Sequence, residues 1–125
     1  MNQLPLFPLK LVLLPKEKIS LHIFEDRYKK MISQCIKQQS MFGIVLSLND
    51  KMEKIGCSVK IINIVKEFDN GEFDITAEGV ARFRVEDVIK DKSLNIGLVE
   101  YIPDETLCHD YNLLNSVHDK YIKIL

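Results

Sequence analysis

Hydrophobic and polar residues alternate along much of the first hundred positions, and one stretch follows a different period. Apolar Ile19, Leu21 and Ile23 alternate with polar neighbours, which is the period of a strand with one buried face. From Glu25 to about Gln39 the apolar residues recur three and four positions apart, as on one stripe of an amphipathic helix. The pattern therefore predicts a strand that runs directly into a helix.

Further strands are predicted on both sides of this pair. The opening QLPLFPLK reads as a strand interrupted by prolines, and because proline cannot donate to a ladder, we expect an edge strand or one that soon leaves the sheet. The polar stretch 47–56 reads as a loop, and Asp69-Asn70-Gly71 predicts a hairpin turn. The remaining strands are expected over residues 41–46, 59–68, 73–89 and 94–101.

A second helix is predicted at the end of the sequence. Asp110 is placed to cap it, and its apolar stripe runs to Leu125 without a stop signal, which favours a fragment or a short stand-alone form. The expected fold class is mainly β with helices (α+β). Six strands with short links predict a partly closed barrel with one helix after the second strand and one C-terminal helix.

Composition and charge narrow the function classes. The 125 residues suit one domain, and 46% hydrophobic with 28% charged residues is an ordinary globular composition. Residues 1–60 carry 10 Lys/Arg against 5 Asp/Glu (+5), and residues 61–125 carry 7 against 13 (−6), which sum to the net charge of −1. This charge asymmetry indicates one of two arrangements. Either the basic half presents a face to an anionic partner, or strands from the two halves pair and mix their charges. With only three arginines, we favour pairing over a nucleic-acid partner.

The cysteines and the N-terminus predict a reducing, cytoplasmic setting. Cys35, Cys57 and Cys108 are odd in number and far apart, so we expect reduced thiols rather than a disulfide framework. The apolar N-terminus lacks the charged start of a signal peptide and is broken by prolines. No run approaches the length of a membrane span, so no membrane partner is expected.

The search for catalytic and metal-binding motifs finds no match. No phosphate-binding, dinucleotide-binding, zinc-protease or nucleophile-elbow motif occurs. Cys108, His109 and His118 are the closest grouping of metal-binding types, but adjacent residues rarely ligate one metal together. Cys35 and Cys57 fit small core residues better than nucleophiles. We therefore predict no catalytic residue, no cofactor and no metal.

The junction between the predicted strand and helix is rich in chemistry-bearing side chains. Glu25, Asp26 and Arg27 form either an acid/base group or a helix-start cluster. Consecutive helical residues point about 100° apart, which disfavours convergence on one substrate. We interpret Phe24, Glu25, Arg27 and Tyr28 as a structural junction in which Arg27 pairs with a carboxylate while Phe24 and Tyr28 pack.

Two blocks of the sequence resemble a known family. LPLFPLKLVLLPKEKISLHIFEDRYKKMI is similar to the opening signature of the N-terminal domain of Lon proteases and its stand-alone bacterial relatives. IGCSVKIINIVKEFDNGEFDITAEGVARFRV resembles the family's second block, which ends in a G-x-x-R-F-R-[IV] strand, here Gly79 to Val85. Asp26 departs from a frequent proline of the family, and Lys18-Ile19-Ser20 lacks the proline expected before the second strand.

The resemblance implies a fold and a function. It implies a PUA-like pseudo-barrel over residues 1–105 and the start of a helical region over 106–125. It also implies a non-catalytic module of protein quality control that recognises unfolded or tagged polypeptides, alone or with protease or ATPase domains. The protease's ATPase and Ser-Lys peptidase motifs have no counterpart in this sequence. An RNA-binding PUA-like module is the alternative, and a small hydrolase with an unrecognised site is a third class.

The consecutive apolar residues 11–14 suggest where a polypeptide would bind. A strand or turn buries only about half of such a run on one face. The remaining side chains are therefore either a binding patch or covered by the C-terminal helices. We expect Leu11, Leu13 and Leu14, with Phe42, to contact the polypeptide.

Overall fold

The structure is a computed structural model, and it describes residues 2–103 of the chain. The elements are β1 (Asn2–Leu9), β2 (Lys18–Ile23), α1 (Asp26–Gln38), β3 (Phe42–Leu48), β4 (Lys51–Glu67), β5 (Phe73–Asp91) and β6 (Leu94–Tyr101). The domain is mostly β with one helix after the second strand, as predicted. The predicted C-terminal helix, and the boundary between residues 105 and 106, lie outside the described residues.

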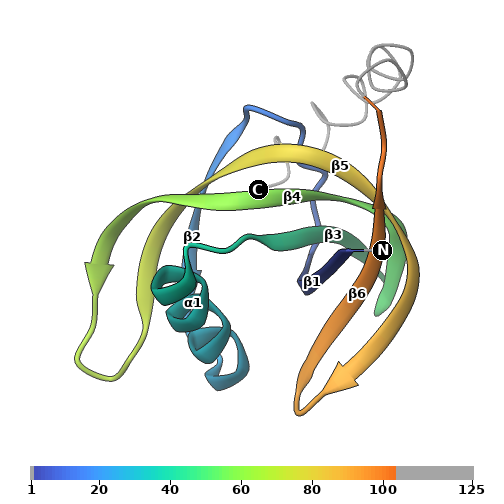
Figure 1. The fold of residues 1–125 in the computed structure, drawn as a ribbon. Coiled ribbons are helices and arrows are strands. Elements are labelled where there is room, and N and C mark those ends of the chain that lie inside the picture. Colours follow the sequence, from blue (N-terminus) through green and yellow to red (C-terminus); the bar gives the residue numbers. More distant parts are fainter. Residues whose placement is uncertain (1, 104–125) are drawn as a thin grey trace.

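The six strands form one curled sheet. Their order is β2-β5-β4-β3-β1-β6, and β6 pairs again with β5, so five strands close into a ring and β2 adds to one side of β5. The long, arched β5 makes this closure possible (Figure 1). It pairs with β2 and β4 through its first half and with β6 through its second half.

The position of β1 differs from the prediction of an edge strand. β1 pairs antiparallel with β6 up to Leu6 and parallel with β3 from Leu6 onwards, so it lies inside the sheet and changes partner at Leu6. Each half is nevertheless paired on one side only. This is the situation at a sheet edge, where Pro5 and Pro8 are tolerated because a ladder is required on one side alone.

The predicted loop over residues 47–56 is wrong, because this stretch is a hairpin. Asn49 and Asp50 adopt φ angles of 52° and 61°, and Leu48 pairs with Lys51 across the turn. Two consecutive residues with positive φ give the backbone twist of a tight hairpin, and Asn and Asp tolerate it. β4 therefore begins at Lys51. The predicted turn at Asp69-Asn70-Gly71 is confirmed.

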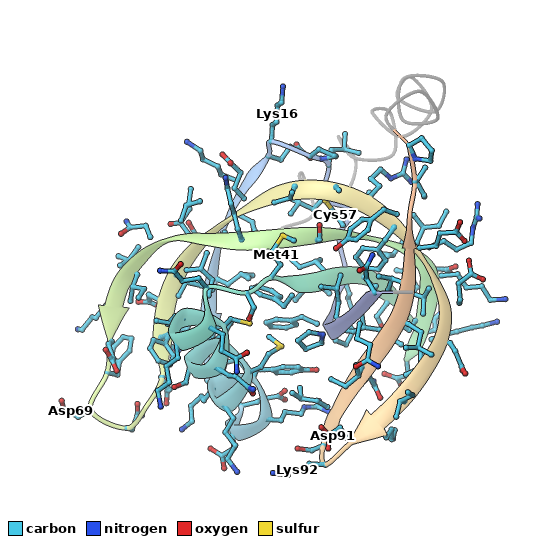
Figure 2. The ribbon with its side chains drawn as sticks, viewed as in Figure 1. Lys16, Met41, Cys57, Asp69, Asp91 and Lys92 are labelled. Carbon is cyan, nitrogen blue, oxygen red and sulfur yellow. The ribbon has the colours of Figure 1, made fainter. Side chains whose placement is uncertain are left out.

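The core is built as the periodicity predicted. α1 buries Tyr28, Met31, Ile32 and Cys35, which confirms the helical stripe. These side chains join strand residues such as Ile23, Phe42, Ile44 and Ile75 in one cluster, and a second cluster forms around Leu6, Val45, Phe83 and Val99. Side chains lie on both sides of the arched strands in Figure 2. No helix within residues 2–103 is long and apolar enough to cross a membrane.

The strands of the basic and acidic halves pair, as expected from the charge asymmetry. β2 lies beside β5, and Lys60 Nζ lies 3.6 Å from Glu78 Oε1 across β4 and β5. The charges of the two halves are therefore interleaved on one sheet.

Candidate functional site

The residues predicted to contact a polypeptide lie inside the domain. Leu11, Leu13, Leu14 and Phe42 are 7%, 7%, 6% and 0% exposed, and Leu11, Leu13 and Phe42 belong to the main core cluster. The loop is fastened to β5, where the Gly79 N–H donates to the Glu17 carbonyl. The expectation of an exposed leucine patch is therefore wrong, because the loop folds its apolar side chains onto the barrel.

Two aromatic residues at the strand-to-helix junction have opposite environments. Tyr28 is 6% exposed and stacks on Phe7 with ring centroids 4.3 Å apart, so its packing role is confirmed. Phe24 is 62% exposed and stacks on His22 with ring centroids 6.0 Å apart, so it makes a surface contact and is not a buried packing anchor. The backbone is still extended at Glu25 (φ −76°, ψ 139°), so the alternation of β2 continues and turns Ile23 inward and Phe24 outward.

Arg27 fastens the start of α1. Its Nη2 lies 3.3 Å from Glu25 Oε2, which confirms the predicted pairing with a carboxylate. Its guanidinium lies 4.7 Å from the centroid of the Tyr28 ring, and Nη1 donates to the Ser93 carbonyl at 3.5 Å. These contacts match the structural interpretation of the cluster.

A cavity of about 330 Å³ opens beside Phe24. Its apolar wall comes from the end of β1 (Phe7, Pro8 and Leu9) and from Leu21 of β2, and Phe24 itself lines it. His22, Glu25 and Arg27 supply its polar groups. We call this cavity and its lining the junction pocket.

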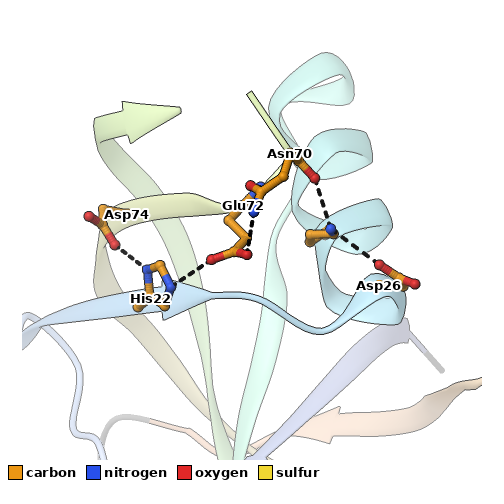
Figure 3. A network of polar contacts seen from close by, with 6 residues as sticks. His22, Asp26, Asn70, Glu72 and Asp74 are labelled. Atoms are coloured by element: carbon orange, nitrogen blue, oxygen red, sulfur yellow. Dashed lines mark hydrogen bonds and ion pairs between the residues drawn. The ribbon is translucent and has the colours of Figure 1, made fainter. Parts of the chain in front are cut away.

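His22, which lines the junction pocket, belongs to a polar network (Figure 3). His22 Nδ1 lies 2.6 Å from Asp74 Oδ1 and Nε2 lies 3.0 Å from Glu72 Oε1. Only an imidazolium can donate at both nitrogens, and the hydrogen bond to Asp74 raises the pKa of His22 above its ordinary value of 6.5. Lys29 Nζ donates to the Asn70 carbonyl at 2.9 Å. The network therefore ties β2, the β4–β5 turn and α1 together.

A second apolar surface follows the last third of β4. Ile62, Ile64 and Val65 are 41%, 42% and 61% exposed. The ladder with β5 shifts register once between the neighbours of Ile62 and once between the neighbours of Val65. Ile62 and Val65 are therefore the extra residues of two β-bulges. A cavity of about 680 Å³ lies between this stretch and the end of α1 at Ile36 and Gln39. We call Ile62, Ile64, Val65 and this cavity the β4 edge surface.

This part of β4 has one free edge. Its pairing with β3 ends at Val59 opposite Phe42, and from Lys60 onwards β5 is its only strand partner within the part of the chain that the structure describes. The cavity lies between this part of β4 and the end of α1.

Comparison with known proteins identifies the family of this fold. The family model described as the ATP-dependent protease La (LON) substrate-binding domain matches residues 3–125. The chain belongs to this family. The crystal structure of a Lon N-terminal domain protein from Xanthomonas campestris is 34% identical, with a TM-score of 0.73 over 82% of this chain and 61% of that one.

A second solved structure shares the fold. The N-terminal domain of a Mycobacterium avium complex Lon protease is 17% identical, with a TM-score of 0.64 over 82% of this chain and 55% of that one. The chain thus spans less than two thirds of both solved Lon domains.

The exposed surfaces of this Lon-family domain were missed by the sequence reasoning, although a signal was present. IINIV, residues 61–65, holds four aliphatic side chains in five positions, which is more than one face of a strand buries. For Phe24, strict continuation of the β2 alternation would have placed its ring outward.

The cysteines of the described Lon-family domain fit the prediction of core residues. Cys35 and Cys57 are free and buried. Burial raises the pKa of the Cys57 thiol to about 12, so almost none of it is thiolate at neutral pH. No group of three or more metal-ligating side chains occurs within residues 2–103. The grouping at Cys108, His109 and His118 lies outside the described residues.

Proposed function

We propose that this domain recognises unfolded or tagged polypeptides without catalysing a reaction on them, and that the junction pocket binds their large apolar side chains. The observation that carries the proposal is Phe24, an aromatic side chain 62% exposed at the edge of an apolar cavity. Exposed aromatic anchors beside concave apolar surfaces are typical of binding sites.

The chemistry of the pocket suits the interior residues of a misfolded protein. Its volume of about 330 Å³ lies at the lower end of the range for ligand pockets. It would bury a large apolar side chain, which contributes roughly 1.5–3 kcal/mol before the cost of ordering both partners is subtracted. A single contact of this kind gives weak binding that tolerates many sequences, as a module that meets many substrates requires.

The family supports this role and sets its context. The family model is named for substrate binding, so polypeptides that an associated protease degrades are the natural partners. We place the domain in bacterial, cytoplasmic quality control, as a PUA-like module acting with ATPase and protease domains. Nucleic acid is not expected to bind.

The test uses two serine variants of the full chain. Phe24→Ser removes the exposed ring, and Val80→Ser removes a side chain that is 40% exposed on β5 and lines neither surface. Binding to a permanently unfolded, fluorescently labelled protein is followed by anisotropy at two salt concentrations, with an RNA oligonucleotide in parallel.

We expect Phe24→Ser to weaken binding of the unfolded protein about tenfold, or about 1.4 kcal/mol, while Val80→Ser binds as the parent does. Equal binding by all three proteins would place the site elsewhere. Tight RNA binding that falls steeply with salt, without binding of the unfolded protein, would overturn the proposed function.

A further inference from the structure

His22 belongs both to the junction pocket and to the polar network. Its ring lines the pocket, and the Phe24 ring stacks on it with centroids 6.0 Å apart and planes 23° apart. In the ladder of β2 and β5 it lies opposite Asp74. The His22 side chain is 48% exposed, so protons from solvent reach it directly. Protonation of His22 therefore changes the charge of the pocket lining.

The charged groups around His22 come from three neighbouring segments. Asp74 Oδ1 on β5 and Glu72 Oε1 in the β4–β5 turn lie 2.6 and 3.0 Å from its two ring nitrogens (Figure 3). On β4, Lys66 pairs with Asp74 in the ladder. Two more charged side chains line the pocket and pair with each other at 3.3 Å, Glu25 and Arg27. Two carboxylates therefore hold the His22 ring directly.

The contact between His22 and Glu72 depends on one proton. An imidazolium donates at both ring nitrogens, whereas a neutral imidazole has one N–H and one bare nitrogen. Asp74 makes the shorter contact and keeps the remaining N–H, so loss of the proton leaves the bare nitrogen facing the Glu72 carboxylate. These two atoms are then both acceptors and repel each other. Glu72 is therefore released from β2 when His22 becomes neutral.

The β4–β5 turn is bonded to Glu72 on both sides. Glu72 Oε2 accepts from Asn70 Nδ2 at 2.6 Å, and the Glu72 N–H donates to Asn70 Oδ1 at 3.0 Å. The Phe68 N–H donates to the Glu72 carbonyl at 2.9 Å, and the Phe68 ring lies edge-on to His22 with centroids 5.6 Å apart. The proton that holds Glu72 thus also fixes the His22 ring against Phe24 and Phe68.

A fixed His22 ring favours binding at the junction pocket. Phe24 is the exposed aromatic side chain of the pocket, and a side chain that is held before binding loses less freedom when an occupant arrives. An occupant also excludes water, which strengthens the attraction between the imidazolium and its two carboxylates. Both ring N–H groups are already bonded, so an apolar occupant does not leave them without partners. Protonation and binding therefore favour each other.

We propose that a proton on His22 regulates the junction pocket, so that the domain binds an apolar polypeptide segment more tightly when His22 is an imidazolium than when it is neutral. The proposal rests on the proposed function and adds its regulation. The ion pairs of His22 are partly exposed, so we expect a modest effect, about threefold in affinity. The hydrogen bond to Asp74 raises the pKa of His22 above 6.5, so affinity should fall on the alkaline side of that value.

The experiment measures binding by the anisotropy of a peptide of Phe, Leu, Ser and Gly. The peptide is blocked at both ends and carries a pH-insensitive dye, so its own charge is constant between pH 6 and 8.5. The proteins, all as the full chain, are the parent, His22→Gln, Glu72→Gln and Glu67→Gln. His22→Gln removes this titration and leaves His109 and His118 in place. Glu67→Gln removes an exposed carboxylate outside the network and is the control for Glu72→Gln.

We expect the parent and Glu67→Gln to bind the peptide about threefold more tightly at pH 6 than at pH 8.5. His22→Gln should bind it equally at both pH values. Glu72→Gln should lose most of the difference, because an amide either accepts from an N–H or donates to a bare nitrogen and so keeps its contact in both states.

An NMR titration of the His22 ring in the parent is the reciprocal measurement. Because the coupling between two binding events is the same in both directions, bound peptide should raise the pKa of His22 by the logarithm of the ratio between the two affinities. This measurement needs no variant of the network, so it does not depend on whether a variant folds.

Equal affinity of the parent at both pH values, or a pKa of His22 that the peptide leaves unchanged, would overturn this regulation and leave the proposed function intact. Tighter binding at pH 8.5 would refute its direction. A difference that survives in His22→Gln would assign the titration to another group and refute the role of His22. Failure of both the peptide and the unfolded protein to bind at either pH would overturn the proposed function itself.

Discussion

Replacing Tyr28 by alanine tests the division between the two aromatic residues of the junction. Tyr28 is 6% exposed and stacked on Phe7, whereas Phe24, four positions earlier, is 62% exposed. Truncation of a buried aromatic side chain costs about 3–5 kcal/mol, and the stacked pair is part of that loss. We expect Tyr28→Ala to lower the free energy of unfolding by about 3 kcal/mol, and Phe24→Ala by less than about 0.5 kcal/mol.

Urea unfolding followed by far-UV circular dichroism measures both changes, since the chain has no tryptophan. A loss of 3 kcal/mol should lower the melting temperature by roughly 10–15 °C in a domain of this size. Tyr28→Phe is the matched control, because it keeps the ring and its burial. Equal losses for Tyr28→Ala and Phe24→Ala, or a loss below about 1 kcal/mol for Tyr28→Ala, would refute the assignment of Tyr28 as the packing residue.

Three further outcomes follow from other parts of the domain. The pKa of His22 is raised in the folded state, so the stabilisation of the fold by His22 is complete below the unfolded pKa of about 6.5 and is lost as pH rises through the folded pKa. Urea midpoints measured between pH 6 and 8.5 should therefore fall with rising pH in the parent. His22→Gln should not show this fall. A Cβ at Gly79 would lie 2.4 Å from the Leu14 carbonyl oxygen, so Gly79→Ala should cost at least about 1–3 kcal/mol, and a melting temperature equal to the parent's would contradict this close approach. Cys35 and Cys57 are buried. In a variant whose third cysteine is replaced by serine, a thiol reagent at pH 8 should therefore label the protein only after denaturation. Rapid labelling of the native protein would show that the core is open.

Some of the structure was determined by short stretches of sequence. Apolar residues that recur three and four positions apart predicted a helix over residues 25–39, and α1 spans Asp26–Gln38. Asp69-Asn70-Gly71 specified its turn, and alternation predicted β6 at its observed bounds. These features depend on the backbone preferences of a few neighbouring residues and on the spacing of apolar side chains along a short segment, so a short stretch of sequence is enough to predict them.

Two errors came from features that no short stretch carries. Residues 47–56 are mainly polar, but they form a hairpin because Asn49 and Asp50 accept positive φ and the end of β3 pairs with the start of β4. β1 is flanked by two strands, one for each half, and that arrangement depends on the closure of the ring by β5 and β6. Strand pairing between distant segments is set by the whole sheet, so a local pattern cannot assign it.

The candidate sites were decided by the tertiary structure. The sequence determined that Leu13 and Phe24 are both apolar, and from this alone either could be a core residue or a surface one. In the folded domain the loop of Leu13 is fastened to β5 and its side chain enters the core, whereas Phe24 meets an open cavity. Exposure is a property of the neighbours that a side chain acquires on folding. Alternation along β2 could place the Phe24 ring outward, but only the packing of β1 and α1 against β2 forms the cavity beside it.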